Sequence, residues 1–298
     1  MLSLQKKMNL LLFIIAYPLL LLISILPFRI LYILSDVICF FVYRVIGYRK
    51  KVVRSNLALA LPHLSDEERL IVEKKSYKHL CDMFLEMIKT MTISKKEMDK
   101  RFTYKNLDEY KNLEKEGKSI ALMLAHYASY EWVVSMNSKV SFKGYGIYKK
   151  VNNKYFDSLV RRIRSKFDAE LISIDKTAEV IASNYANNIK STYGFASDQS
   201  PQLRGITHWH KFMGIEVPVY VGGELLSKKF DMNMMFLKVS KLKRGFYEAE
   251  FELLSNDVKS VPNFELMNTF LEKVEKQILE APEYYLWTHR RWKHMGKR

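Results

Sequence analysis

The chain has 298 residues, of which 48% are hydrophobic and 27% are charged, so it can bury a large core and is neither disordered nor fibrous. Its 48 Lys and Arg residues against 32 Asp and Glu give a net charge of +16, which predicts an anionic partner: nucleic acid, an anionic membrane surface or an acidic carrier. The two cysteines, Cys39 and Cys81, cannot build a disulfide framework and favour a reducing compartment.

The first fifty residues predict attachment to a membrane. Residues 10–26 are uncharged and follow Lys6 and Lys7. As a helix they would span roughly 25 Å, slightly less than a hydrocarbon core of about 30 Å. Residues 30–46 form a second apolar run that two charged residues interrupt, which suits an interface. A basic cluster typical of attachment to anionic lipid follows: Arg44, Arg49, Lys50, Lys51 and Arg54.

We therefore expect residues 1–50 to be a membrane anchor with an interfacial helix, and residues 51–298 to be one catalytic domain. A signal peptide is an alternative, but the run is long for one and no small-residue cleavage site follows it. A buried core helix is the other alternative. Positive charge on both sides of the region fits either one span or a re-entrant hairpin.

Beyond residue 54 the pattern changes from helices to alternating strands and helices. Ser65 and Glu68 form a capping box that opens an amphipathic helix over residues 66–91, with Leu80 and Phe84 among its apolar residues. Short apolar runs predict strands at 119–125, 146–148, 171–174 and 193–197, with helices at 155–167 and 176–188. A strand, turn and strand cover 232–253, and a closing helix covers 263–279. The pattern predicts an α/β fold with a central, mainly parallel sheet flanked by helices, behind an N-terminal membrane-anchoring helical segment.

Two residues after the first predicted strand are candidates for catalysis. His126 directly follows the apolar run and Glu131 lies five residues further on. An imidazole at a strand end can take a proton from an attacking hydroxyl, and a nearby carboxylate can hold its other nitrogen. No Gly-x-Ser-x-Gly motif is present, so direct attack on an acyl donor is favoured over a covalent acyl-enzyme. The spacing also occurs by chance, so two residues without a shared role remain the alternative.

A resemblance to a known family strengthens the assignment of His126 and Glu131. Residues 119–132, SIALMLAHYASYEW, resemble the motif of the bacterial lipid A biosynthesis acyltransferases, the late secondary-acylation enzymes of the lysophospholipid and glycerolipid acyltransferase superfamily. Similar segments follow in the same order: Asp198-Gln199 before Pro201, then residues 212–214 and 222–224, and the tail YLWTHRRWK at 285–293. The resemblance covers nearly the whole chain.

It implies transfer of a fatty acyl group from acyl carrier protein to a hydroxyl of a lipid A precursor. The reaction would take place at the cytoplasmic face of the bacterial inner membrane, without metal or organic cofactor. His126 would be the base and Glu131 its partner. Substrate contacts would come from Arg164, Asp198, Gln199 and Lys149. The implied partners are the carrier, the precursor or a related anionic lipid, and the membrane surface, but not nucleic acid.

The sequence departs from the family pattern at Ala128-Ser129-Tyr130, where Gly-Asn-Trp is usual. The reaction type survives, but the acceptor stays open: a lysophospholipid, an amino-acid lipid or a glycolipid is the nearest alternative, and a non-catalytic basic scaffold a more distant one. We expect an acyl groove lined by neighbouring apolar residues together with some of the following four: Tyr127, Trp132, Phe212 and Met213.

Several other groups have two interpretations. Asp198 could position His126, contact a substrate or cap the turn before Pro201. His208 and His210 form a metal pair or, as we favour, part of a lid loop. The basic tail with Trp287 and Trp292 could bind nucleic acid, but interfacial tryptophans suit an anchored protein better. We expect three basic residues at the late hairpin turn to form a solvated tip: Lys241, Lys243 and Arg244.

Overall fold

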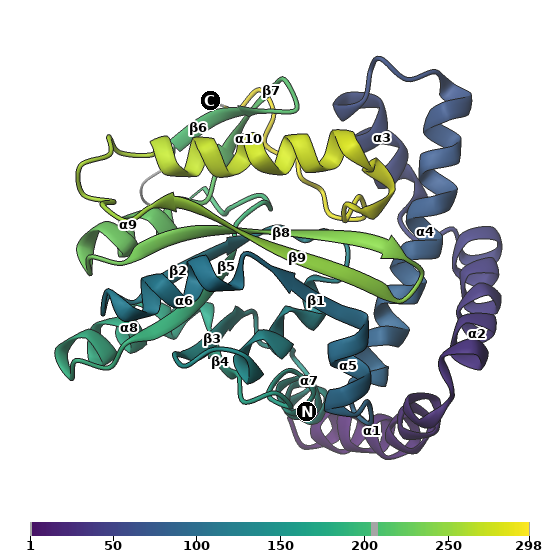
Figure 1. The fold of residues 1–298 in the computed structure, drawn as a ribbon. Coiled ribbons are helices and arrows are strands. Elements are labelled where there is room, and N and C mark those ends of the chain that lie inside the picture. The colour runs from purple at the N-terminus through teal and green to yellow at the C-terminus, as the bar shows by residue number, and fades with distance from the viewer. Residues whose placement is uncertain (1, 204–207, 298) are drawn as a thin grey trace.

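The computed structural model describes residues 2–203 and 208–297, which contain a seven-stranded sheet and a separate two-stranded ribbon (Figure 1). The sheet has the order β1-β9-β8-β2-β5-β3-β4. Its strands are β1 Phe102–Lys105, β2 Ile120–Leu124, β3 Lys143–Tyr148, β4 Glu170–Ser173, β5 Ser191–Ala196, β8 Asn233–Lys243 and β9 Phe246–Ser255. All of its pairings are parallel except β8 with β9. The expected α/β class with a mainly parallel sheet is confirmed.

Helices flank this sheet. The α-helices of the body are α3 Lys50–Ala60, α4 Asp66–Lys89, α5 Lys95–Arg101, α6 Leu107–Lys115, α7 Lys154–Arg164, α8 Thr177–Ala186, α9 Gly222–Lys229 and α10 Glu265–Glu280, with 3-10 turns at η2 Tyr130–Ser138, η3 Ile174–Lys176 and η4 Pro282–Tyr284. The predicted capping box is present, because Ser65 Oγ accepts the Glu68 N–H and the Glu68 carboxylate accepts the Ser65 N–H. Helices α7 and α8 connect parallel strands, as the alternating pattern predicts.

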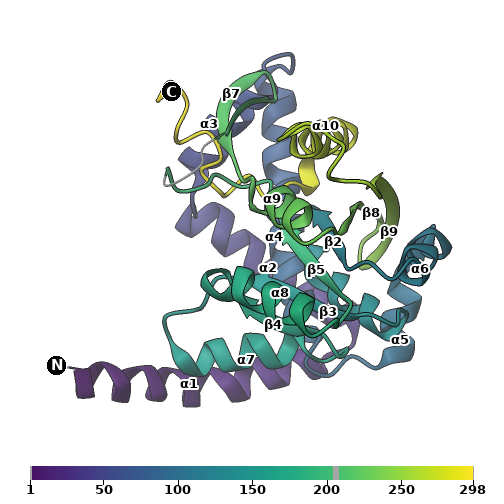
Figure 2. The ribbon, with the colours of Figure 1, turned by 90° about the vertical axis from the view of Figure 1, so that its left-hand side faces the viewer.

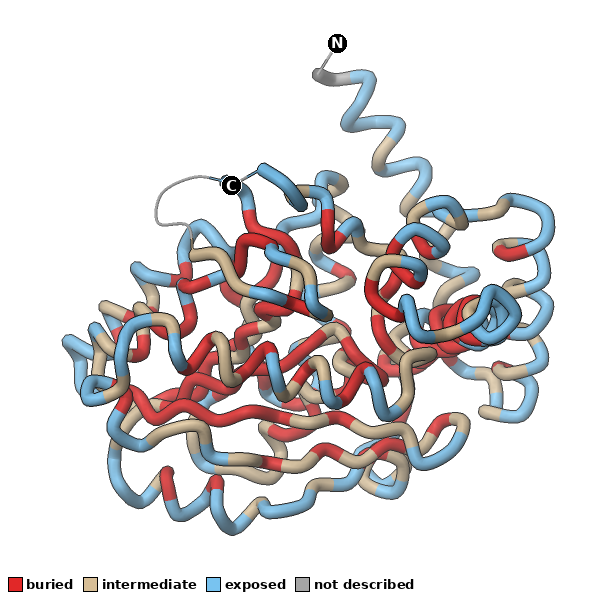
Figure 3. The backbone as a smooth tube through the Cα atoms, turned by 90° about the horizontal axis from the view of Figure 1, so that it is seen from above, coloured by how far each residue is buried: buried red, intermediate tan, exposed pale blue. Residues whose placement is uncertain are grey.

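The core lies in the middle of the sheet. Every residue of β2 is buried, which explains its uninterrupted apolar sequence: a central parallel strand covered on both faces needs apolar side chains on both. Figure 3 shows buried residues concentrated along the strands, while the N-terminal helix is mostly exposed or half-buried.

The N-terminal segment consists of α1 Leu2–Ile25, α2 Phe28–Phe40 and the π-helical turn η1 Phe41–Ile46. One described helix is long and apolar enough to cross a membrane: residues 4–25, with a mean hydropathy of 2.4 and 6% of that stretch buried. The later helices Phe28–Ile46 and Lys50–Ala60 pass the same test only together, and they are bent by 92°. Helix α1 runs along the base of the body beside α7, and its N-terminal end extends past the body (Figure 2).

Helix α4 differs from its expected amphipathic pattern. Phe84, placed on the apolar face by the sequence, is 51% exposed, whereas His79, Asp82 and Glu86 are buried. Most of their side-chain partners come from the β8–β9 hairpin and from α2, so this part of the helix packs against polar and charged side chains.

The prediction of a solvated hairpin tip is wrong for Lys241 and Arg244. Arg244 makes a bidentate pair with Asp82, with Nε–Oδ2 and Nη2–Oδ1 distances of 2.9 and 2.6 Å, and also pairs with Asp36. The Lys241 side chain is 8% exposed and lies 3.8 Å from Asp82. The hairpin therefore docks on α4 and α2, while Lys243 stays exposed.

The prediction that the tail tryptophans lie at a membrane interface is also wrong. Trp287 and Trp292 are 1% and 5% exposed, and their rings stack with centroids 6.2 Å apart. Arg291 is fully buried. The Asn56 amide donates to the carbonyls of Trp287 and His289, both at 2.7 Å, which holds the tail against α3. The tail is core structure.

Candidate active site

The register of two neighbouring strands brings the main candidate residues together. Strands β2 and β5 are parallel, and Leu124 pairs with Ala196 as the last residue of each strand. His126 and Asp198 each follow that pair by two residues, so both lie at the same carboxyl edge of the sheet. Ligand sites of open α/β sheets form at this edge.

Asp198 holds the imidazole of His126. Its Oδ1 lies 2.7 Å from His126 Nδ1 and also accepts the His126 backbone N–H at 3.0 Å. An ionised carboxylate only accepts hydrogen bonds, so Nδ1 carries the ring proton and Nε2 keeps its lone pair. Of the three interpretations of Asp198, these contacts favour the one in which it positions His126. Asp198 is fully buried and is not part of the wall of the neighbouring cavity.

Charge and hydrogen bonding keep this buried carboxyl ionised. Burial alone would raise its pKa, but the charge of His126 and the two hydrogen bonds from His126 hold the pKa of Asp198 below its ordinary value. Two buried residues interact with the charge of Asp198. Burial raises the pKa of Tyr285 and lowers the pKa of Arg291. The negative charge of Asp198 partly offsets the lowering of the Arg291 pKa.

Glu131 has a different partner from the expected one. Its carboxylate accepts two hydrogen bonds from Arg164, at 2.8 Å from Nε and 2.5 Å from Nη2. The expected contact between Glu131 and a ring nitrogen of His126 is absent; Asp198 contacts Nδ1, and Glu131, the second residue of the 3-10 turn η2, faces Arg164 at the end of α7. Glu131 and Arg164 form a bidentate pair that lines the same cavity as His126.

A cavity of about 670 Å³ opens beside these residues. Five of the six predicted site residues contribute to its wall, and Asp198 does not; the five are His126, Glu131, Arg164, Lys149 and Gln199. Its remaining wall is largely apolar and comes from β2, η2, β3, β4 and β5, including Leu122, Leu124, Val134, Ile147, Leu171 and Phe195. Its size lies within the roughly 300 to 1,000 Å³ usual for ligand pockets.

The expected groove residues lie elsewhere. Tyr127, Trp132 and Phe212 are 3%, 0% and 0% exposed and belong to the core. Trp132 faces α4, where its Nε1 donates to Thr90 Oγ1 at 3.0 Å. Phe212 stacks on Trp292 at 6.0 Å. Met213 packs against the same core and is not part of the cavity wall.

Sequence reasoning missed two histidines near the site. His289 lines the cavity, and its Nε2 accepts the Ser200 N–H at 3.3 Å. Burial lowers the pKa of His289 to about 4, so this ring is neutral near pH 7. His79 contacts the loop after His126 from the side of α4. His289 could have been found from the sequence, because it lies within the tail motif YLWTHRRWK. No motif contains His79.

The two histidines that we assigned to a lid loop lie in the ribbon of β6 His208–Phe212 and β7 Ile215–Val219. His208 stacks on Phe264 at 4.6 Å, and its Nε2 lies 2.9 Å from Asn268 Oδ1. Within residues 2–203 and 208–297, no three side chains of His, Cys, Asp or Glu gather where they could hold a metal ion.

Comparison with known proteins agrees with this architecture. The family model described as bacterial lipid A biosynthesis acyltransferase matches residues 4–294. The chain is 22% identical over 250 residues to the lipid A biosynthesis palmitoleoyltransferase of Escherichia coli (strain K12), covering 82% of this chain and 79% of that protein. The same identity and coverage hold for a lipid A biosynthesis acyltransferase of Shigella flexneri. The family match extends over the N-terminal helices, the sheet and the buried tail, and the chain belongs to the bacterial lipid A biosynthesis acyltransferases.

Proposed function

We propose that the protein transfers a fatty acyl group from the thioester of acyl carrier protein to a hydroxyl of a lipid A precursor, with His126 as the general base. The observation that carries this proposal is the His126–Asp198 pair at the edge of a largely apolar cavity. Membership of an acyltransferase family supports the reaction class.

The chemistry follows from the tautomer. His126 Nε2 takes the proton of the acceptor hydroxyl, and the hydroxyl oxygen attacks the thioester carbonyl carbon. The resulting tetrahedral intermediate carries its charge on the former carbonyl oxygen. When that intermediate collapses, the carbon–sulfur bond breaks and the departing thiolate receives the proton from the imidazolium. Asp198 stabilises the imidazolium while it exists.

Two features can stabilise the developing oxyanion. The Glu131 pair engages Nε and Nη2 of Arg164, and Nη1 is outside this pair. The turn η2 begins at Tyr130, four residues after His126, so we assign the N–H groups at its start as further donors to the oxyanion. We assign Arg164 to the oxyanion or to an anionic group of the acceptor, and Lys149 and Gln199 to substrate contacts on the same wall.

The N-terminal helices would hold the enzyme at the inner membrane with the body on the cytoplasmic face. Helix α1 exposes aliphatic side chains along its length, among them Leu11, Ile15, Leu19 and Leu22 at 58 to 67%. A lipid acceptor would then reach the site without leaving the membrane, while a soluble acidic carrier would meet a surface with excess positive charge.

The test is a transfer assay on membranes with a labelled acyl-carrier thioester and three acceptors: an under-acylated lipid A precursor, a lysophospholipid and an amino lipid. We expect product on the lipid A precursor, lost in His126→Ala and retained in His63→Ala, which removes an exposed histidine. Product on another acceptor alone would keep the mechanism and change the pathway. Turnover that survives His126→Ala would exclude His126 as the base.

A further inference from the structure

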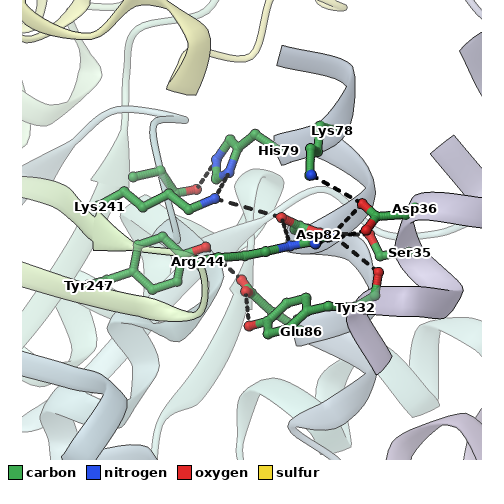
Figure 4. Close-up of polar contacts among 11 residues, drawn as sticks. Tyr32, Ser35, Asp36, Lys78, His79, Asp82, Glu86, Lys241, Arg244 and Tyr247 are labelled. Atoms are coloured by element: carbon green, nitrogen blue, oxygen red, sulfur yellow. Dashed lines mark hydrogen bonds and ion pairs between the residues drawn. The ribbon is translucent and has the colours of Figure 1, made fainter. Parts of the chain in front are cut away.

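His79, in the middle of α4, contacts the loop that carries the candidate catalytic residues. Its Nε2 lies 3.2 Å from the carbonyl oxygen of Ala128, and its Nδ1 lies 3.2 Å from Lys241 Nζ. Figure 4 shows the side chain of Lys241, from the β8–β9 hairpin, pointing to this ring. The residue is 5% exposed.

The two contacts define the tautomer of this ring. An ammonium group only donates, so Nδ1 accepts from Lys241 and Nε2 must carry the proton. The Nε2–H therefore donates to the Ala128 carbonyl. Burial and the charge of Lys241 lower the pKa of His79 to about 3, so the ring is neutral near pH 7. A neutral ring in a single tautomer gives a directed donor.

Lys241 is itself held in place by charge. Its side chain is 8% exposed and lies 3.8 Å from Asp82, which Arg244 also binds. Arg244 continues to Asp36 on α2 (Figure 4). The His79 ring thus belongs to a connected polar network and not to a loosely packed gap.

The residue that receives this hydrogen bond has an unfavourable backbone. Ala128 has a φ of 47°, in the left-handed region that costs a residue with a Cβ about 1 to 2 kcal/mol. Its N–H donates to the Tyr284 carbonyl at 2.9 Å, and its own carbonyl accepts from His79. These bonds hold one peptide on each side of Ala128, and so define where the chain enters η2 after His126.

We propose that His79 is a positioning residue for acyl transfer: through the Ala128 carbonyl it holds the loop that sets His126 and Glu131 in their relative places. The inference rests on the proposed role of His126. A shift of the 128–129 peptide would move Tyr130, whose ring lies 4.9 Å from that of His126, and Glu131 with its Arg164 partner.

The experiment compares His79→Gln with His79→Asn in the full-length protein on membranes. Glutamine places its amide near the position of Nε2 and can still donate to Ala128, whereas asparagine is one carbon shorter and ends near Nδ1. We expect kcat within about threefold of wild type for the glutamine variant and a loss of about ten- to hundredfold for the asparagine variant. KM should change less than about twofold in both, because neither variant alters the cavity wall.

Thermal unfolding of each variant separates positioning from stability. Equal kcat in the two variants, whether both are normal or both are low, would overturn the proposal even if both melt at lower temperature. A third variant combines His79→Asn with Ala128→Gly, because glycine adopts the φ of position 128 without strain. Recovery of kcat by about threefold or more supports the proposal, and no recovery contradicts it.

The same assay separates this inference from the proposed function. Absence of His126-dependent transfer by the unmodified protein would remove both. His126-dependent transfer without a difference between glutamine and asparagine at position 79 would remove only the role of His79.

Discussion

Asp198 is a fully buried carboxylate that contacts the candidate catalytic histidine, His126. A buried carboxylate is expensive unless charges and hydrogen bonds compensate it. Here Oδ1 alone accepts two N–H groups of His126. The charge of Asp198 in turn raises the pKa of the buried Arg291 against the effect of its burial. This arrangement keeps one charged oxygen on Nδ1 of His126, which is the requirement for a basic Nε2.

Asp198→Asn should lower kcat about a hundredfold or more, because an amide can present its N–H to Nδ1 and reverse the tautomer. Asp257→Asn, at an exposed turn after β9, should leave kcat unchanged and serves as the control. The measurement is initial-rate transfer with saturating donor and acceptor. A loss of less than about threefold would show that the tautomer of His126 does not limit turnover.

The same variant has a pH signature in its stability. The pKa of Asp198 is lower in the folded chain than its ordinary value of 3.8, so its contribution to stability is complete above that value and is lost as pH falls through the folded pKa. The unfolding free energy of the wild type should exceed that of Asp198→Asn at pH 7, and the difference should shrink below pH 3.8. Denaturant titrations at several pH values measure this difference. A difference that is constant over the whole range would contradict an ionised Asp198.

The site could be predicted only in part. His126 and Asp198 each follow a short apolar run, and the strand-end rule identifies such positions from the sequence alone. Their adjacency depends on β2 and β5 being neighbours, which no local pattern encodes. Without that neighbour, Glu131 was the nearest carboxylate in the sequence, and so it was assigned the role that Asp198 has.

At the scale of elements, sequence patterns located the long periodic helices and most strands of the sheet, but not several shorter elements, the apolar strand β7 among them. Strand β1 and helices α5 and α6 have few apolar residues and were not predicted. The buried face of α4 was missed for a different reason. Arg244, which pairs with Asp82 on this face, lies 162 residues further along the chain, so no local pattern connects the two residues.

Arg244→Met should destabilise the fold by about 2 to 3 kcal/mol, below the 3 to 5 kcal/mol of a fully buried pair because the Arg244 side chain is 28% exposed. The loss arises from leaving Asp82, which is 1% exposed, without its bidentate partner. Lys243→Met at the same hairpin end is the matched control and should cost less than about 0.5 kcal/mol. Chemical denaturation gives both values. Equal effects would mean that the hairpin is not anchored through Arg244.

At the scale of the whole molecule, the N-terminal helices and the cavity wall are mechanically connected. Arg164, the last residue of helix α7, pairs with Glu131, and α7 packs against α1. Phe13 of α1 stacks on Tyr155 at 5.7 Å, and Arg162 donates to Tyr17 at 2.6 Å. The proposed membrane helix therefore supports the element that forms one side of the proposed active site, and if α1 lies in a membrane it would place the cavity close to lipid.

A double substitution on α1 tests whether its exposed face binds lipid. Leu11→Glu with Ile15→Glu places two charges one helical turn apart at positions 58% and 67% exposed. Because these side chains contact little protein, folding should be unaffected, but each charge costs up to about 3 kcal/mol in a hydrocarbon environment. We expect the fraction that floats with liposomes to fall sharply. Leu253→Glu with Leu279→Glu, at exposed apolar positions of the body, should float like the wild type. If both doubles float equally well, another surface holds the protein at the membrane, and the support that α1 gives to α7 would be structural alone.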